Sequence, residues 1–135
     1  MKKKHHIIKK EKYHIPIFGG TIIFILTDNI KYVYDKYKLT AEYHETDEVD
    51  TECLVIDHRT KEGFQRIFVI FVLPNLNLKI EKIINLLGHE LRHIVNNIGL
   101  YRGLSFSKNK DEHMSYLQGQ ILEEMFKFIK SYIKN

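Results

Sequence analysis

Apolar residues recur at steps of three and four between residues 80 and 98, and this period constrains the fold more than any other feature. Because a helix turns about 100° per residue, the spacing gathers these side chains on one face of a long helix. Asn77 is the expected cap of this helix and Gly99 its expected end. A second helical pattern starts near Lys110 or Asp111 and runs toward the C-terminus. Two helices with apolar faces need an apolar layer to cover.

Apolar segments ahead of these helices supply that layer. Residues 21–26 (TIIFIL) are rich in β-branched and aromatic side chains, which is typical of a buried strand. Residues 51–58 and 64–74 flank RTKEG, and this arrangement predicts a hairpin with Gly63 in its turn.

A short helix is expected over residues 28–39, capped by Asp28. The acidic segment 40–50 has no periodic apolar face and is expected to be a surface loop. The sequence therefore predicts an α+β fold, in which a small, mostly antiparallel sheet packs on the helix over 80–98, followed by a C-terminal helix.

The length of 135 residues is typical of one domain. Residues 1–12 hold six Lys and one Glu, or +5, whereas the whole chain is +4, so the remainder is about −1. We expect a basic flexible tail over 1–12 and a single domain over 13–135. The tail could touch phosphate, lipid or an acidic partner, but such termini are usually just solvated, so nucleic acid is not an expected partner.

The apolar runs IIFIL and IFVIFVL are far shorter than a membrane span, and no apolar segment follows the basic start as in a signal peptide. The single cysteine, Cys53, cannot form an intramolecular disulfide. We expect a cytoplasmic protein with no membrane partner.

The segment GHELRH places His89 and His93 four residues apart with Glu90 between them. Positions four apart lie about 40° apart on a helix, so two imidazoles can face one ion. Glu90, 60° to 100° around the helix from them, can reach a water at the metal without being a ligand. This is the chemistry of H-E-x-x-H, two nitrogen ligands and a carboxylate base on one rigid element, and it predicts Zn²⁺ as cofactor. An ordinary amphipathic helix with two exposed histidines is the alternative.

Catalytic zinc needs a third protein ligand and an open fourth position. Glu112 lies nineteen residues after His93, at the start of the next expected helix. A helix–loop–helix turn could return its carboxylate to the first helix, with Asp111 and His113 as rivals. Acidic residues are also favoured in a first helical turn by the helix dipole alone. Tyr116, one turn after Glu112, could orient that ligand or donate to an oxyanion.

The order of elements, HELRH and the helix opening at Glu112 resemble the minimal core of the zincin metallopeptidases, in the gluzincin-like branch. More narrowly, IPIFGG, HELRH and DEHMSYLQGQI resemble short metallopeptidase-like proteins encoded by phages and prophages. The resemblance covers about residues 14–130, and HExxH is its specific part. Where gluzincins carry an acid four residues after the ligand Glu, this chain has Tyr116, and it lacks the large second domain that walls their cleft.

The resemblance implies zinc on His89, His93 and Glu112, with Glu90 as the general base. It also implies a peptide or protein substrate paired with the edge of a strand near residues 65–73. A phage-encoded chain would act in the bacterial cytoplasm or with the virion. The alternative function is non-catalytic, as a virion or host-interaction protein on a degenerate zincin scaffold with a phage or host protein as its partner.

Overall fold

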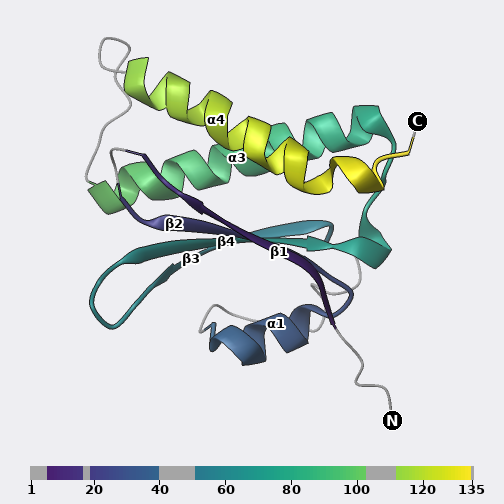
Figure 1. Cartoon of the computed structure of the whole chain (residues 1–135), viewed down its shortest axis with the longest axis horizontal. Helices are drawn as coiled ribbons and strands as arrows, with labels where there is room; N and C mark the ends of the chain where they lie inside the picture. The colour runs from purple at the N-terminus through teal and green to yellow at the C-terminus, as the bar shows by residue number, and fades with distance from the viewer. Residues whose placement is uncertain (1–5, 17–18, 40–50, 103–111, 135) are drawn as a thin grey trace.

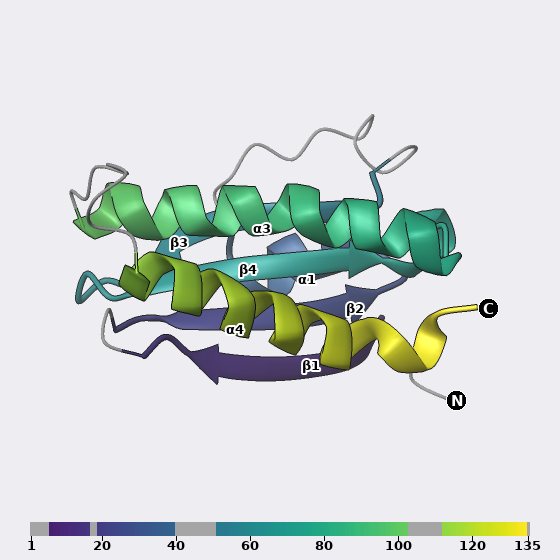
Figure 2. The same cartoon turned by 90° about the horizontal axis from the view of Figure 1, so that it is seen from above.

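The computed structural model describes residues 6–16, 19–39, 51–102 and 112–134, without the side chains of 100–102, 112 and 113. In chain order the elements are β1 (Ile7–His14), β2 (Thr21–Thr27), α1 (Ile30–Tyr37), β3 (Cys53–Arg59), β4 (Gln65–Val72), η1 (Leu73–Asn75), α3 (Ile80–Arg102), α4 (Glu112–Ile129) and η2 (Lys130–Tyr132). Helix α1 covers one face of the sheet, and α3 and α4 lie side by side on the other (Figures 1 and 2). The fold is α+β, as the sequence predicts.

The sheet is mixed, and two of its three strand pairings are antiparallel. Its strand order is β1-β2-β4-β3. The outer pairs β1/β2 and β3/β4 are antiparallel, but the central pair β2/β4 is parallel. The strand over 65–72 is therefore central, and the expectation that it offers a free edge to a peptide is wrong. Strands β1 and β3 are the edges.

Residues 7–12 are part of the sheet. The prediction that they belong to a flexible tail is therefore wrong. They belong to β1, which pairs with β2 from Ile7 to His14. Lys9 Nζ donates to the Phe128 carbonyl at 2.8 Å, and Tyr13 Oη donates to Gln120 Oε1 at 3.3 Å. These contacts tie β1 to α4 and make it part of the domain.

Two apolar clusters fill the spaces on either side of the sheet. The larger lies under α3 and α4, where the Phe128 ring is 5.6 Å from the Phe24 ring and 5.9 Å from the Phe71 ring. The smaller lies under α1 and contains Val33, Phe68 and other residues. Burying these side chains on both faces supplies the main driving force for folding.

The sequence signals for turns and helix caps predicted the right kind of element, but some lie one or a few residues from the position in the structure. The β3–β4 hairpin is confirmed, with Gly63 at φ 89° in its turn. Asn29, and not Asp28, caps α1, because its side chain accepts from the Tyr32 N–H. Helix α3 continues through Gly99 to Arg102, so Gly99 does not end it.

None of the described helices is both long enough and apolar enough to cross a lipid bilayer.

Candidate metal centre

His89 and His93 come together on the exposed side of α3. Their Nε2 atoms are 3.2 Å apart, and their ring centroids are 4.8 Å apart at an interplanar angle of 75°. Two nitrogens that each lie about 2.0–2.1 Å from one tetrahedral zinc ion are about 3.3–3.4 Å apart. The pair therefore has the spacing of two ligands of one ion.

The α3 helix holds this orientation because its opposite side is anchored in the core. Ile83, Leu87 and Ile94 are buried against the sheet. The buried amide of Gln65 donates from Nε2 to the Asn97 carbonyl at 3.0 Å and to Asp57 Oδ1 at 3.3 Å. These bonds link α3 to β4 and β3, so the helix cannot rotate about its axis without breaking them.

Glu90 lies between the exposed histidines and the core. It is 6% exposed, and its Oε1 is 3.9 Å from His89 Nε2. Burial raises the pKa of Glu90 from 4.5 to about 7. A carboxyl group that exchanges its proton near neutral pH has the property of a general base.

Cys53, on the edge strand β3, belongs to the same surroundings. Burial raises the pKa of its thiol well above 9.0, and the nearby Glu90 carboxylate raises it further. The thiol is thus neutral, and it lies near Glu90 on the sheet face that α3 covers. The alternation of side chains along β3 indicates which residues share a face with Cys53. The sequence does not indicate that α3 covers this face, so the proximity of Cys53 to Glu90 was not predicted.

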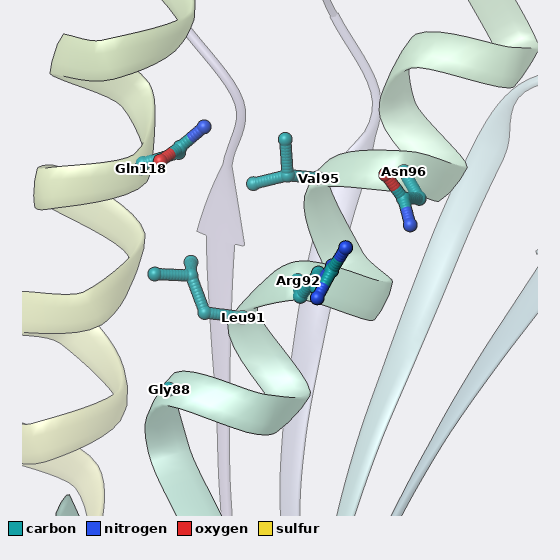
Figure 3. Close-up of a pocket in the computed structure, with 6 residues that line it drawn as sticks. All are labelled: Gly88, Leu91, Arg92, Val95, Asn96 and Gln118. Atoms are coloured by element: carbon teal, nitrogen blue, oxygen red, sulfur yellow. The ribbon is translucent and has the colours of Figure 1, made fainter. Parts of the chain in front are cut away.

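Helix α4 lies on the opposite flank of α3 from the two histidines. A groove of about 420 Å³ between the helices is lined by Gly88, Leu91, Arg92, Val95 and Asn96 of α3 and by Gln118 of α4 (Figure 3). His89 and Leu91 are two residues apart, as are His93 and Val95, so each pair diverges by about 200° around the helix. The imidazoles therefore diverge from Leu91 and Val95. Arg92 and Asn96 of the same lining lie about 60° and 20° from His89 around the helix, so the outer rim of the groove adjoins the two histidines.

The predicted third ligand, Glu112, is the first residue of α4, and its side chain lies outside the described residues, as does that of His113. Asp111 also lies outside them. Within the described part of the chain, no three His, Cys, Asp or Glu side chains form a group able to hold a metal. The structure thus supplies two converging imidazoles and a buried carboxyl, and the third ligand stays a prediction.

Tyr116 lies on α4 with its side chain 75% exposed. The described residues therefore leave the Tyr116 ring exposed to solvent. Its predicted role, to orient Glu112 or donate to an oxyanion, stays a prediction.

No family model, curated protein or solved structure matches this chain.

Proposed function

We propose that the protein is a small zinc-dependent metallohydrolase that cleaves peptide bonds. The observation that carries the proposal is the 3.2 Å separation of the His89 and His93 Nε2 atoms, with the Glu90 carboxyl next to them. Two imidazoles with this spacing suit zinc, and zinc held there would supply Lewis-acid activation of a water and of the scissile carbonyl.

In this proposal Glu90 moves the protons. With its pKa raised to about 7, the carboxylate can take a proton from the attacking water and return it to the leaving amine near neutral pH. Its burial fixes the position of the carboxyl next to His89. Glu112 is the proposed third ligand.

A peptide substrate is proposed to pair with β3. The Val72 N–H donates to the Glu52 carbonyl, and the Thr60 N–H donates to the Phe64 carbonyl. The even-numbered residues of β3 therefore direct their backbone N–H and C=O groups toward β4. The backbone groups of the odd-numbered residues then point outward from the sheet; these residues are Cys53, Val55 and Asp57. They lie along the edge of β3, near the buried Glu90. An extended peptide could complete this ladder, with its carbonyl groups close to the two histidines.

The first experiment measures zinc content after chelation, reloading and dialysis. We expect close to one zinc per wild-type chain, and a large loss in His93→Ala and in Glu112→Gln. Glu123→Gln is the matched control, because Glu123 is an exposed acid on the same helix and forms a surface ion pair with Lys127. Wild-type protein that stays free of zinc contradicts the proposal.

The second experiment measures hydrolysis of a mixture of unstructured peptides by mass spectrometry. The zinc-loaded wild type should generate new peptide ends, whereas Glu90→Gln should keep its zinc and lose hydrolysis by a factor of 100 or more, roughly the contribution of a general base. Zinc binding without any cleavage would favour the non-catalytic alternative.

A further inference from the structure

The sheet face that α1 covers carries a row of basic side chains from β1. Lys10 Nζ is 4.9 Å from the centroid of the Tyr37 ring of α1, which fixes the face on which Lys10 lies. Because side chains alternate along a strand, Lys12 and His14 lie on the same face, whereas Lys9 and Tyr13 contact α4 on the other.

One rung of the sheet on this face is polar across all four strands. His14, Thr21, Arg66 and His58 are consecutive partners in the strand register, and we call these four residues the polar rung. The Thr21 hydroxyl is 3.3 Å from His14 Nδ1, and Arg66 Nη2 donates to His58 Nδ1 at 2.9 Å.

The guanidinium of Arg66 is incompletely satisfied within the described residues. Its Nε is buried and has no hydrogen-bond partner there. Burial, and then the neighbouring Arg66 charge, lower the pKa of His58. His58 is therefore neutral and accepts from Arg66 through Nδ1, which leaves its Nε2–H as a donor. Both side chains offer donors and so suit an anionic ligand.

Helix α1 ends before it reaches the polar rung. The ring of its last residue, Tyr37, lies 5.1 Å from the Phe68 ring, centroid to centroid, and is tilted by 51° from it. Arg66 lies two residues before Phe68 in β4. Figure 1 shows the β3–β4 hairpin extending past this end of α1. Phe64, 65% exposed, precedes Arg66 by two residues, so alternation places its ring on the same face.

We propose that this end of the sheet, which none of the described helices covers, binds single-stranded nucleic acid. Arg66 and Lys12 contact phosphates, and Phe64 and the exposed His14 ring stack on bases. A sheet surface that combines cations with exposed aromatic rings is the usual platform for single strands, because every base has a stacking face.

Charge complementarity favours an anionic ligand over a cationic or apolar one, and the exposed rings of Phe64 and His14 favour a single strand over an acidic peptide. Among the described strand residues, the acids Glu11 and Asp57 lie on the opposite face: Asp57 bonds Gln65 toward α3, and Glu11 alternates with Lys10 and Lys12. The face of the polar rung thus has cations from β1 and β4 and no strand carboxylate. The expectation that nucleic acid is not a partner assumed a solvated tail over residues 1–12, whereas residues 7–12 belong to β1.

The test is fluorescence anisotropy of a short labelled oligothymidylate titrated with the full chain at low salt. We expect saturable binding that Phe64→Ala weakens about fivefold or more, since one base loses its stacking partner. Arg66→Gln should weaken binding and reduce the slope of log K against log salt by about 0.7, the value for one phosphate contact on a single strand. Phe64 is exposed, so its replacement keeps the test valid even if Arg66→Gln disturbs folding.

Lys82→Gln is the matched control for Lys12→Gln, because both remove one exposed charge and Lys82 lies on α3, on the other side of the sheet. We expect a loss for Lys12→Gln and none for Lys82→Gln. An equal loss in both, no binding by the wild type, or equal affinity for the matching duplex overturns the proposal. His93→Ala should bind the oligonucleotide normally, which separates this surface from the candidate metal centre.

Discussion

The Glu90 carboxyl lies at the boundary between the core and the two exposed imidazoles, and its ionisation is coupled to folding. The folded chain holds this proton up to about pH 7, whereas the unfolded chain releases it near pH 4.5. The folded state therefore binds more protons between these values, so the contribution of Glu90 to the free energy of unfolding falls as the pH rises through this range.

We predict that Glu90→Gln stabilises the metal-free protein relative to the wild type by an amount that grows with pH. The difference should be small near pH 4.5 and reach about 1–2 kcal/mol by pH 8, since glutamine never carries the buried charge. Urea unfolding of both chains in the presence of a chelator, at several pH values, measures it. A constant difference would show that Glu90 ionises normally in the folded chain.

The exposed imidazoles lead to a separate prediction about zinc. A ligand that binds only the folded state stabilises it by RT ln(1 + [L]/Kd), or about 2.7 kcal/mol at one hundred times Kd. Added zinc should therefore raise the Tm of the wild type by several degrees, and His93→Ala should lose most of this rise. His14→Ala, on the other side of the sheet, is the control and should respond like the wild type.

The two histidines were predictable because helical spacing alone brings residues four apart together, and their Nε2 atoms do meet. The depth of Glu90 was not predictable in the same way. Its helical position is on the margin of the apolar face, so its burial depends on how the sheet packs against α3. Which residues surround a side chain depends on strand order, and strand order is not a local property of the sequence.

At the scale of the elements, the N-cap of α1 lies one residue after the predicted cap. Asp28 and Asn29 are both good caps, and the sequence does not choose between them. In the structure Asp28 Oδ1 is 2.9 Å from His6 Nδ1, and this leaves Asn29 to accept from the start of the helix.

We predict that Asn29→Ala lowers the free energy of unfolding by about 1 kcal/mol, the usual loss for a helix cap. Asp28→Ala should cost less, because a partly exposed ion pair contributes little. Chemical denaturation of the two variants gives the comparison. The reverse order would place the cap at Asp28.

Gly88 in α3 lines the groove between α3 and α4, and Gly119 in α4 offers a comparison outside the lining. Neither would bring an added Cβ within 4 Å of another group outside its own helix, and both are exposed in helices. We predict that Gly88→Ala and Gly119→Ala each raise stability by up to about 1 kcal/mol, because alanine is the better helix former. If Gly88→Ala alone also lowers hydrolysis, the backbone next to His89 is approached by substrate.

At the scale of the whole molecule, β1 was missed because its sequence, IIKKEKYH, has the charge of a solvated segment. Its strand character depends on partners far along the chain, such as β2 and the Phe128 carbonyl. The β3–β4 hairpin was found because its turn and both its strands are contiguous. The parallel pairing of β2 with β4 joins residues more than forty positions apart and has no local signature.

We predict that deleting residues 1–12 strongly destabilises the domain, because it removes most of an edge strand and uncovers one side of β2. The thermal transition should broaden or disappear in circular dichroism. Replacing Lys2, Lys3 and Lys4 with Gln in the full chain removes charge without touching β1 and is the control. A truncated chain that unfolds like the wild type would mean that β1 contributes little.

The bond between Lys9 and the Phe128 carbonyl also bears on how the chain is made. It joins positions 119 residues apart, and Phe128 packs its ring between Phe24 and Phe71. A nascent chain can form its hairpins early on the ribosome. Its largest apolar cluster closes only after Phe128 has left the exit tunnel, and until then the sheet face awaiting α4 is exposed to chaperones.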